Sequence, residues 1–241
     1  PTGVWGSQDQ YDSWGYHVKT YMGMNTLYGR GIGGQTYSWR NNGGSVAFAN
    51  ADGSLNSRDD NYNYDNFNGT TPTNTTMIRG AFSSWLRIVN SIPLSIKDTI
   101  DFIIVMGGTN DIAGNVAIGN NAFVSNSSVD PEWAASSYYN GGDFDISTYI
   151  GGMCSTIMKL QIWCPNAVII VATPLNGRSS DNSTGTNDTD WFTNSLGFTY
   201  NDYVNESIKV LRGFGTPCID VYGTCGINPF NRATYITDVV H

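Results

Sequence analysis

The chain has 241 residues, of which 40% are hydrophobic, 13% aromatic and 13% charged, and its formal net charge is −8. This length is sufficient for a large domain with its own core, although the charged share is only about half of the usual one. An acidic chain without a cluster of lysines and arginines argues against a nucleic-acid-binding protein. The apolar runs have the length of strands, well short of the roughly 18 residues of a membrane span.

Helical and strand patterns alternate along the chain. In chain order they predict a helix at 13–24, a helix at 77–92, a strand at 101–108, a helix at 145–163, a strand at 167–174, a helix at 200–215 and a strand at 217–223. The first helix would be capped by Asp12 or Ser13, and the last would end at Gly213 or Gly215. Such alternation is typical of a parallel sheet with helices on both faces and right-handed crossovers.

Three polar stretches interrupt the alternation, at 41–76, 112–144 and 177–197. They are rich in Asn, Gly, Ser, Asp and aromatic residues, and we expect long surface loops or insertions, which in α/β domains often form the substrate site. The sequence contains no internal repeat and no linker between two cores. Residues 1–241 are therefore predicted to be a single domain, and the chain is expected to be a segment of a longer protein.

The sequence contains only weak evidence for a metal site or a dinucleotide-binding site. The cysteines Cys154, Cys164, Cys218 and Cys225 form no C-x-x-C pair, which argues against zinc; disulfides and buried thiols both remain open. The run Gly29–Gly34 matches G-x-G-x-x-G, but no clear helix or second strand follows it. It is either a glycine turn or a loop that offers a backbone N–H to a developing anion.

Four short motifs contain candidate functional residues. Asn110 follows the strand at 101–108 and could direct its amide into a ligand crevice, or it could form a simple Asn-Asp turn. Asp238 precedes His241 by three residues, as in a pair where a carboxylate orients an imidazole base. Ser7 follows Gly6 at the start of the chain, where a strand-to-helix turn would expose a nucleophile. The other histidine, His17, lies in a predicted helix and is interpreted as a structural or surface residue.

The order of these motifs resembles that of the SGNH (GDSL-type) hydrolase family over nearly the whole chain. The third block is matched by Gly108, Asn110 and Asp111, and the last block by Asp238 and His241. The resemblance implies a three-layer α/β/α sandwich with a central, mostly parallel sheet of the flavodoxin-like SGNH type. It further implies a Ser7 nucleophile, a His241 base oriented by Asp238, and an oxyanion hole formed by Gly34, Asn110 and the Ser7 backbone N–H.

The first block departs from the Gly-Asp-Ser of the family, because the chain reads Gly6-Ser7-Gln8. If the Asp is missing, Ser7 is the nucleophile; if the blocks align without a gap, Gln8 takes that place and the site is inactive. Ser13 follows an Asp but lies within the predicted first helix. The chain also ends at His241, where the family continues with a closing helix.

The resemblance implies a serine esterase that needs no metal or cofactor. Aromatic side chains flanked by hydrogen-bonding Asn and Asp side chains, in the loops at 59–69, 130–143 and 188–192, suit the faces and edges of sugar rings, which favours O-acetyl esters on carbohydrate as substrates. The alternative is an inactive SGNH-fold module that binds glycans or serves as part of a phage tail or surface fibre. The low-charge composition favours an extracellular or virion-associated protein, and membership of a larger assembly fits both alternatives.

Overall fold

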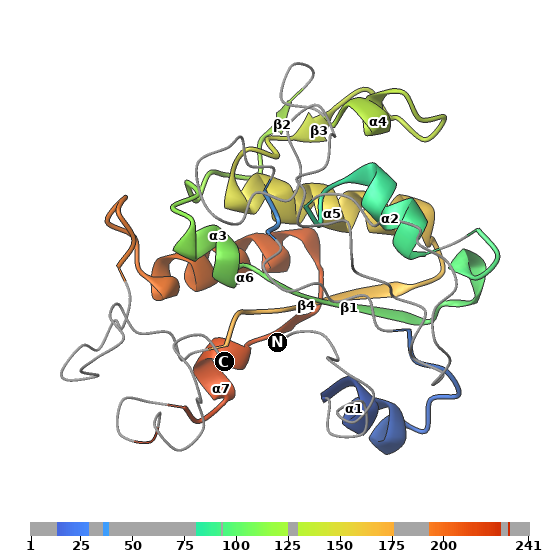
Figure 1. Cartoon of the computed structure of the whole chain (residues 1–241), viewed down its shortest axis with the longest axis horizontal. Coiled ribbons are helices and arrows are strands. Elements are labelled where there is room, and N and C mark those ends of the chain that lie inside the picture. Colours follow the sequence, from blue (N-terminus) through green and yellow to red (C-terminus); the bar gives the residue numbers. More distant parts are fainter. Residues whose placement is uncertain are drawn as a thin grey trace, which may run out of the picture.

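The computed structural model describes residues 14–28, 36–38, 81–92, 94–124, 130–175, 193–227 and 231, which form an α/β fold (Figure 1). In chain order the elements are α1 (Trp14–Met22), α2 (Trp85–Ser91), a 3₁₀ turn (Lys97–Thr99), β1 (Phe102–Met106), α3 (Thr109–Ala113), β2 (Phe123–Val124), α4 (Pro131–Ala134), β3 (Asp143–Phe144), α5 (Tyr149–Trp163), β4 (Val168–Ala172), α6 (Tyr200–Phe214), β5 (Cys218–Ile219) and α7 (Val221–Thr224).

The main sheet of the described residues has the strand order β1-β4-β5, and both pairings are parallel. β1 and β4 pair from Phe102 opposite Val168 to Met106 opposite Ala172, so the two β-branched runs lie side by side. A continuous apolar run is what a strand needs when helices cover the sheet. The strands predicted at 101–108 and 167–174 are thus confirmed, each shorter at its ends.

Helices lie on both sides of this sheet. Figure 1 shows α2, α5 and α6 on one side of β1 and β4, and α1 and α7 on the other. α5 links β1 to β4, and α6 links β4 to β5, which is the crossover arrangement of a parallel sheet. The mixed α/β class is confirmed, and the complete three-layer SGNH sandwich stays a prediction.

The two long helices begin and end at capping residues. Thr199 forms a capping box with Asp202 at the start of α6, and Gly215 closes that helix with a φ of 65°. The helix predicted at 200–215 is confirmed, and of its two predicted end residues, Gly213 and Gly215, the latter is the C-cap. α5 begins at Tyr149 rather than at 145, because the Thr148 side chain accepts a hydrogen bond from the backbone N–H of Gly151 and caps the helix there.

Two predicted elements are too long. The strand predicted at 217–223 ends at Ile219, because the Asp220 side chain caps α7 by accepting from the Gly223 backbone N–H. The helix predicted at 77–92 begins only at Trp85, because the Ser84 side chain accepts from the Arg87 backbone N–H. Ser, Thr and Asp side chains compete with regular structure in this way, and an apolar period does not reveal it.

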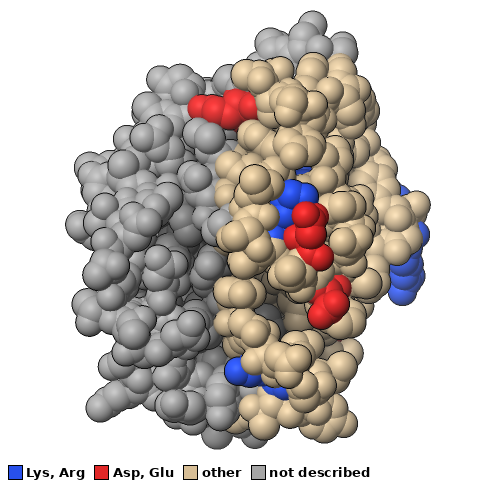
Figure 2. All heavy atoms as spheres, turned by 90° about the vertical axis from the view of Figure 1, so that its right-hand side faces the viewer, with Lys and Arg blue, Asp and Glu red and all other residues tan. Residues whose placement is uncertain are grey.

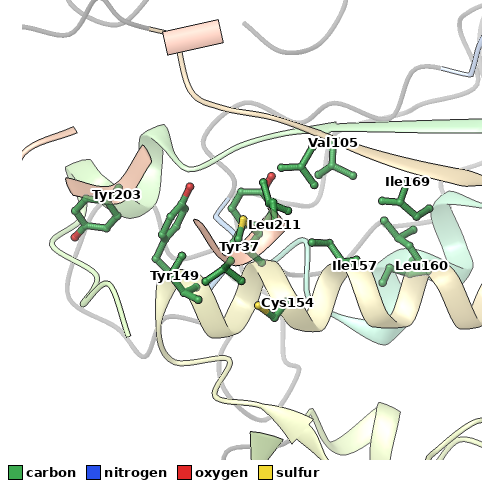
Figure 3. Packing of buried hydrophobic residues seen from close by; sticks show 14 of the residues in the cluster. Tyr37, Val105, Tyr149, Cys154, Ile157, Leu160, Ile169, Tyr203 and Leu211 are labelled. Atoms are coloured by element: carbon green, nitrogen blue, oxygen red, sulfur yellow. The ribbon is translucent and has the colours of Figure 1, made fainter. Parts of the chain in front are cut away.

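The hydrophobic core lies between the sheet and the helices α2, α5 and α6. Figure 3 shows Ile157 and Leu160 of α5 facing Val105 of β1 and Ile169 of β4, with Leu211 of α6 beside them. All five side chains are buried. This packing fixes α5 against the sheet, so the loops at both ends of α5 are built on a rigid support.

The stretch 112–144 was predicted to be a long surface loop or an insertion, and its described residues form a structured insertion. It contains the antiparallel pair β2–β3 and the short helix α4, and Trp133 of α4 is completely buried. The Trp133 indole donates a 3.0 Å hydrogen bond to the Gly142 carbonyl. Its ring therefore belongs to the core and is not available to a sugar ring.

A buried ionic cluster attaches this insertion to α5. Lys159 of α5 has its Nζ 3.0 Å from Asp130 Oδ2 and 2.8 Å from Asp143 Oδ2, and all three side chains are fully buried. Lys159 also donates to the Ser83 carbonyl at 2.6 Å, and the Trp85 backbone N–H donates to Asp130 at 2.6 Å. The contact with Asp143 has the distance of an ion pair rather than the alignment of a hydrogen bond. Buried charges of this kind persist only when they are paired.

The described surface carries few charges. Figure 2 shows the right-hand side of the molecule, where a few acidic and basic side chains stand among largely uncharged described residues. Within the described ranges, no helix combines the length and the apolarity that crossing a bilayer requires.

Candidate active site

The carboxyl ends of the parallel strands define the candidate site. β1 leads within two residues into α3, and β5 leads into α7, so both short helices lie at the same edge of the sheet (Figure 1). In open α/β sheets, ligands bind in the crevice outside this edge. The motif Gly107–Ile112 therefore lies where its sequence predicted.

Aromatic rings explain the two glycines that precede α3. A Cβ on Gly107 would lie 2.9 Å from Phe82 and 3.0 Å from Tyr37, and a Cβ on Gly108 would lie 2.9 Å from the Tyr149 ring. Gly108 also has a φ of 106°, which side chains rarely adopt. The backbone at the site therefore rests directly on aromatic side chains.

Asn110 and Asp111 occupy the first turn of α3. Asn110 is half-buried, and the helix replaces the Asn-Asp turn that was the alternative for this position. Asp111 is completely buried, and its carboxylate accepts hydrogen bonds from the Tyr37 N–H at 2.9 Å, the Ser38 N–H at 3.0 Å and the Ser38 hydroxyl at 2.6 Å. This contact joins α3 to a segment that lies 73 and 74 residues away in sequence.

The role of Asp111 was missed in the sequence. There it matched a family block, but nothing in its neighbourhood indicated a partner near residue 38. In α3, Asp111 stands next to Ile112, which is fully buried. This neighbour indicates at most that Asp111 is buried as well, and it does not indicate which groups bind the carboxylate. A buried carboxylate needs donors, and their identity becomes visible only in the fold.

Most of the predicted site residues lie outside the described residues. These are Ser7, Gly34, Asp238 and His241, together with the alternatives Gln8 and Ser13. Among the predicted oxyanion donors the structure places Asn110, and it places the segment 36–38 that follows Gly34. His17 is exposed on α1, which agrees with a surface role.

Three tyrosines lie beneath the site. Tyr37 and Tyr149 approach each other edge-on with ring centroids 5.7 Å apart, and Tyr149 meets Tyr203 at 5.1 Å (Figure 3). The hydroxyls of Tyr149 and Ser207 are 2.9 Å apart. Burial raises the pKa of Tyr149 and of Tyr37 well above the ordinary value of 10.0, so both phenols are neutral at physiological pH.

α5 approaches the segment 36–38 through a glycine. A Cβ on Gly152 would lie 2.6 Å from the Tyr37 carbonyl carbon and 2.8 Å from the Ser38 nitrogen, and it would also meet the Tyr37 carbonyl oxygen. These are backbone atoms, so no side-chain rotation can relieve the overlap. Gly152 is thus required for the docking of this segment on α5.

Replacing Gly152 with alanine is expected to lower the free energy of unfolding by about 1–3 kcal/mol, as overpacking typically does. The matched control is Gly213→Ala in α6, where a Cβ meets nothing within 4 Å. That change is expected to stabilise the protein by up to about 1 kcal/mol, since alanine favours helix. Urea unfolding followed by circular dichroism measures both. Equal stability of Gly152→Ala and wild type would contradict the close approach.

The described residues contain no group of three or more His, Cys, Asp or Glu side chains that is arranged to hold a metal ion. All four cysteines are free thiols. Burial raises the pKa of Cys154 to about 12 and that of Cys164 to about 11, so neither is a thiolate nucleophile near neutral pH.

Comparisons with known proteins extend the fold assignment. The chain matches no known protein family, and no curated protein matches its sequence. One solved crystal structure aligns over 98% of this chain and 80% of its own, at 20% identity and a TM-score of 0.58. This alignment shows a shared fold.

Two further solved structures align over shorter parts. A protein from Lactobacillus plantarum covers 58% of each chain at 22% identity and a TM-score of 0.42. A possible lipase from Chitinophaga pinensis covers 51% of this chain and 42% of its own, at 22% identity and a TM-score of 0.33. Both alignments are too loose to carry an argument about this chain.

Proposed function

We propose that the chain is a serine esterase of the SGNH type. The observation that supports it best is the joining of two sequence blocks at the carboxyl edge of the sheet. Asn110 stands in the first turn of α3 there, and Asp111 binds the segment 36–38, which begins two residues after Gly34. The SGNH oxyanion hole draws its donors from these two blocks, and they are far apart in sequence.

The proposed mechanism uses a covalent acyl-enzyme. His241, oriented by Asp238, takes the proton of the Ser7 hydroxyl while the Ser7 oxygen attacks the ester carbonyl carbon. The negative charge on the carbonyl oxygen is stabilised by the N–H groups of Gly34 and Ser7 and by the Asn110 amide. His241 returns the proton to the departing alcohol, and a water molecule then releases the acid from Ser7 by the same steps.

We propose O-acetyl esters on carbohydrate as the substrate class. The support is the composition of the loops at 59–69 and 188–192, which combine aromatic with amide and carboxylate side chains. In the third such loop, 130–143, Trp133 is buried and does not contribute, while Tyr138 is exposed. The same composition supports the proposal that the protein is extracellular or virion-associated. It also supports a second proposal, that the chain is part of a larger assembly.

Labelling of the wild-type protein with a serine-reactive fluorophosphonate tests this function. We expect one label, located by peptide mapping on residue 7, and release of acetate from an acetylated glycan in preference to hydrolysis of long-chain acyl esters. A preference for long-chain esters would reject the carbohydrate substrate alone. The absence of both label and turnover would reject the esterase and favour the inactive glycan-binding module, which the unusual Gly6-Ser7-Gln8 block supports.

A further inference from the structure

The proposed mechanism assigns no role to Asp111, although its side chain binds a distant segment of the chain. This carboxylate is completely buried, and it accepts three hydrogen bonds from residues of a single distant segment. Hydrogen bonds to a charged acceptor are roughly twice as strong as those between neutral groups. The segment is thus held at a defined distance from α3.

Other elements hold the same segment from its remaining sides. The Thr36 carbonyl accepts from the Phe82 N–H at 2.9 Å, and the Tyr37 carbonyl accepts from the Ser83 hydroxyl at 2.7 Å. Gly152 of α5 closes on the Tyr37 backbone. Among these contacts, the hydrogen bonds of Asp111 connect the segment directly to α3, the helix that also contains Asn110.

We propose that Asp111 is a positioning residue that sets the spacing between Asn110 and the segment 36–38, which follows the predicted oxyanion donor Gly34 in the sequence. This inference rests on the esterase function proposed above. Asp111 is the chain neighbour of Asn110, and its carboxylate binds both Tyr37 and Ser38, so a change at Asp111 alters the distance between Asn110 and this segment. A misplacement of about 1 Å at a reacting group can cost about 100-fold in rate.

A carboxylate fits this role where an amide does not. Both oxygens of Asp111 accept from backbone N–H groups, one from Tyr37 and the other from Ser38. The amide of an asparagine has a single acceptor oxygen, so its NH₂ group would face one of these donors. One backbone bond would be lost, and the segment would shift relative to α3.

The test compares Asp111→Asn with Asp130→Asn, using p-nitrophenyl acetate as substrate. Asp130 is the matched control because it is also fully buried and accepts from backbone N–H groups, those of Trp85 at 2.6 Å and Glu132 at 3.1 Å. Both variants are expected to unfold at lower urea concentration. Only Asp111→Asn should lower kcat, by about 100-fold, with KM within about threefold of wild type. Its pH–rate profile should keep the wild-type inflections, because the base is untouched.

The outcomes separate this inference from the esterase proposal. If wild type turns over and folded Asp111→Asn keeps its kcat, the esterase stands and the positioning role is rejected. An equal loss in Asp130→Asn, or shifted pH inflections in Asp111→Asn, also rejects it. If wild type does not turn over, both proposals fail.

A second variant serves if Asp111→Asn does not fold. Ser38→Ala removes one of the three donors and leaves both backbone bonds. We expect a several-fold drop in kcat at unchanged KM, and an unchanged kcat would reject the proposal.

Discussion

Replacing Ser7 with alanine is expected to lower the turnover of p-nitrophenyl acetate by a factor on the order of 10⁶, the loss seen when a triad serine is removed. Alanine has no hydroxyl to attack the carbonyl carbon, while the remaining oxyanion donors preserve only a small part of the rate. Initial rates of the purified variant, with its circular dichroism spectrum matched to wild type, measure this effect.

Ser13→Ala is the control for this experiment. Ser13 immediately precedes α1, and its hydroxyl is the alternative nucleophile that the chain offers. We expect its turnover to remain within about threefold of wild type. If Ser13→Ala loses activity while Ser7→Ala keeps it, the assignment of the first block is wrong, although the esterase proposal survives.

Replacing Lys159 with methionine is expected to lower the free energy of unfolding by about 3–5 kcal/mol. Methionine fills the space of the stem, but Asp130 and Asp143 would then be buried without their cation. Such a loss is a large part of the roughly 5–15 kcal/mol that stabilises a typical domain. Urea unfolding followed by tryptophan fluorescence is a suitable measurement because Trp85 and Trp133 pack beside the cluster.

Lys209→Met is the matched control, since Lys209 pairs with Glu206 on the exposed side of α6 with 74% of its side chain accessible. We expect a change within about 0.5 kcal/mol. The triple variant Lys159→Met, Asp130→Asn, Asp143→Asn should recover part of the lost stability, because it leaves no unpaired charge. A similar stability of Lys159→Met and Lys209→Met would show that the ion pairs do not anchor the insertion.

The sequence predicted those parts of the fold that local patterns determine. β1 and β4 are unbroken β-branched runs, and α6 combines an apolar stripe with its caps at Thr199 and Gly215. The end of β5 was misjudged because Asp220 was counted as a strand residue, although its side chain caps α7. Aspartate is a preferred N-cap residue, so Asp220 was itself a usable signal that a helix could begin there.

Long-range ionic contacts account for what the sequence did not reveal. The stretch 112–144 has the composition of a loop, yet Lys159 holds it through Asp130 and Asp143. Likewise, Asp111 finds its donors at Tyr37 and Ser38. Pairings of this kind depend on the folded topology rather than on any local period. The position of Asn110 just past a parallel strand could be read from local patterns, because such an end is a topological position, while its catalytic role stays a prediction.

The pairing of Asp111 with Ser38 also bears on the order in which the chain folds. Docking this segment closes a loop of 73 residues, an entropic cost that local helical contacts do not carry and that is repaid only when the partner surface already exists. α3, α5 and the neighbouring strands provide that surface, so the segment 36–38 docks onto a sheet that has already formed. A partly folded population would therefore lose the docking of the segment 36–38 first, while most of its helices and strands persist.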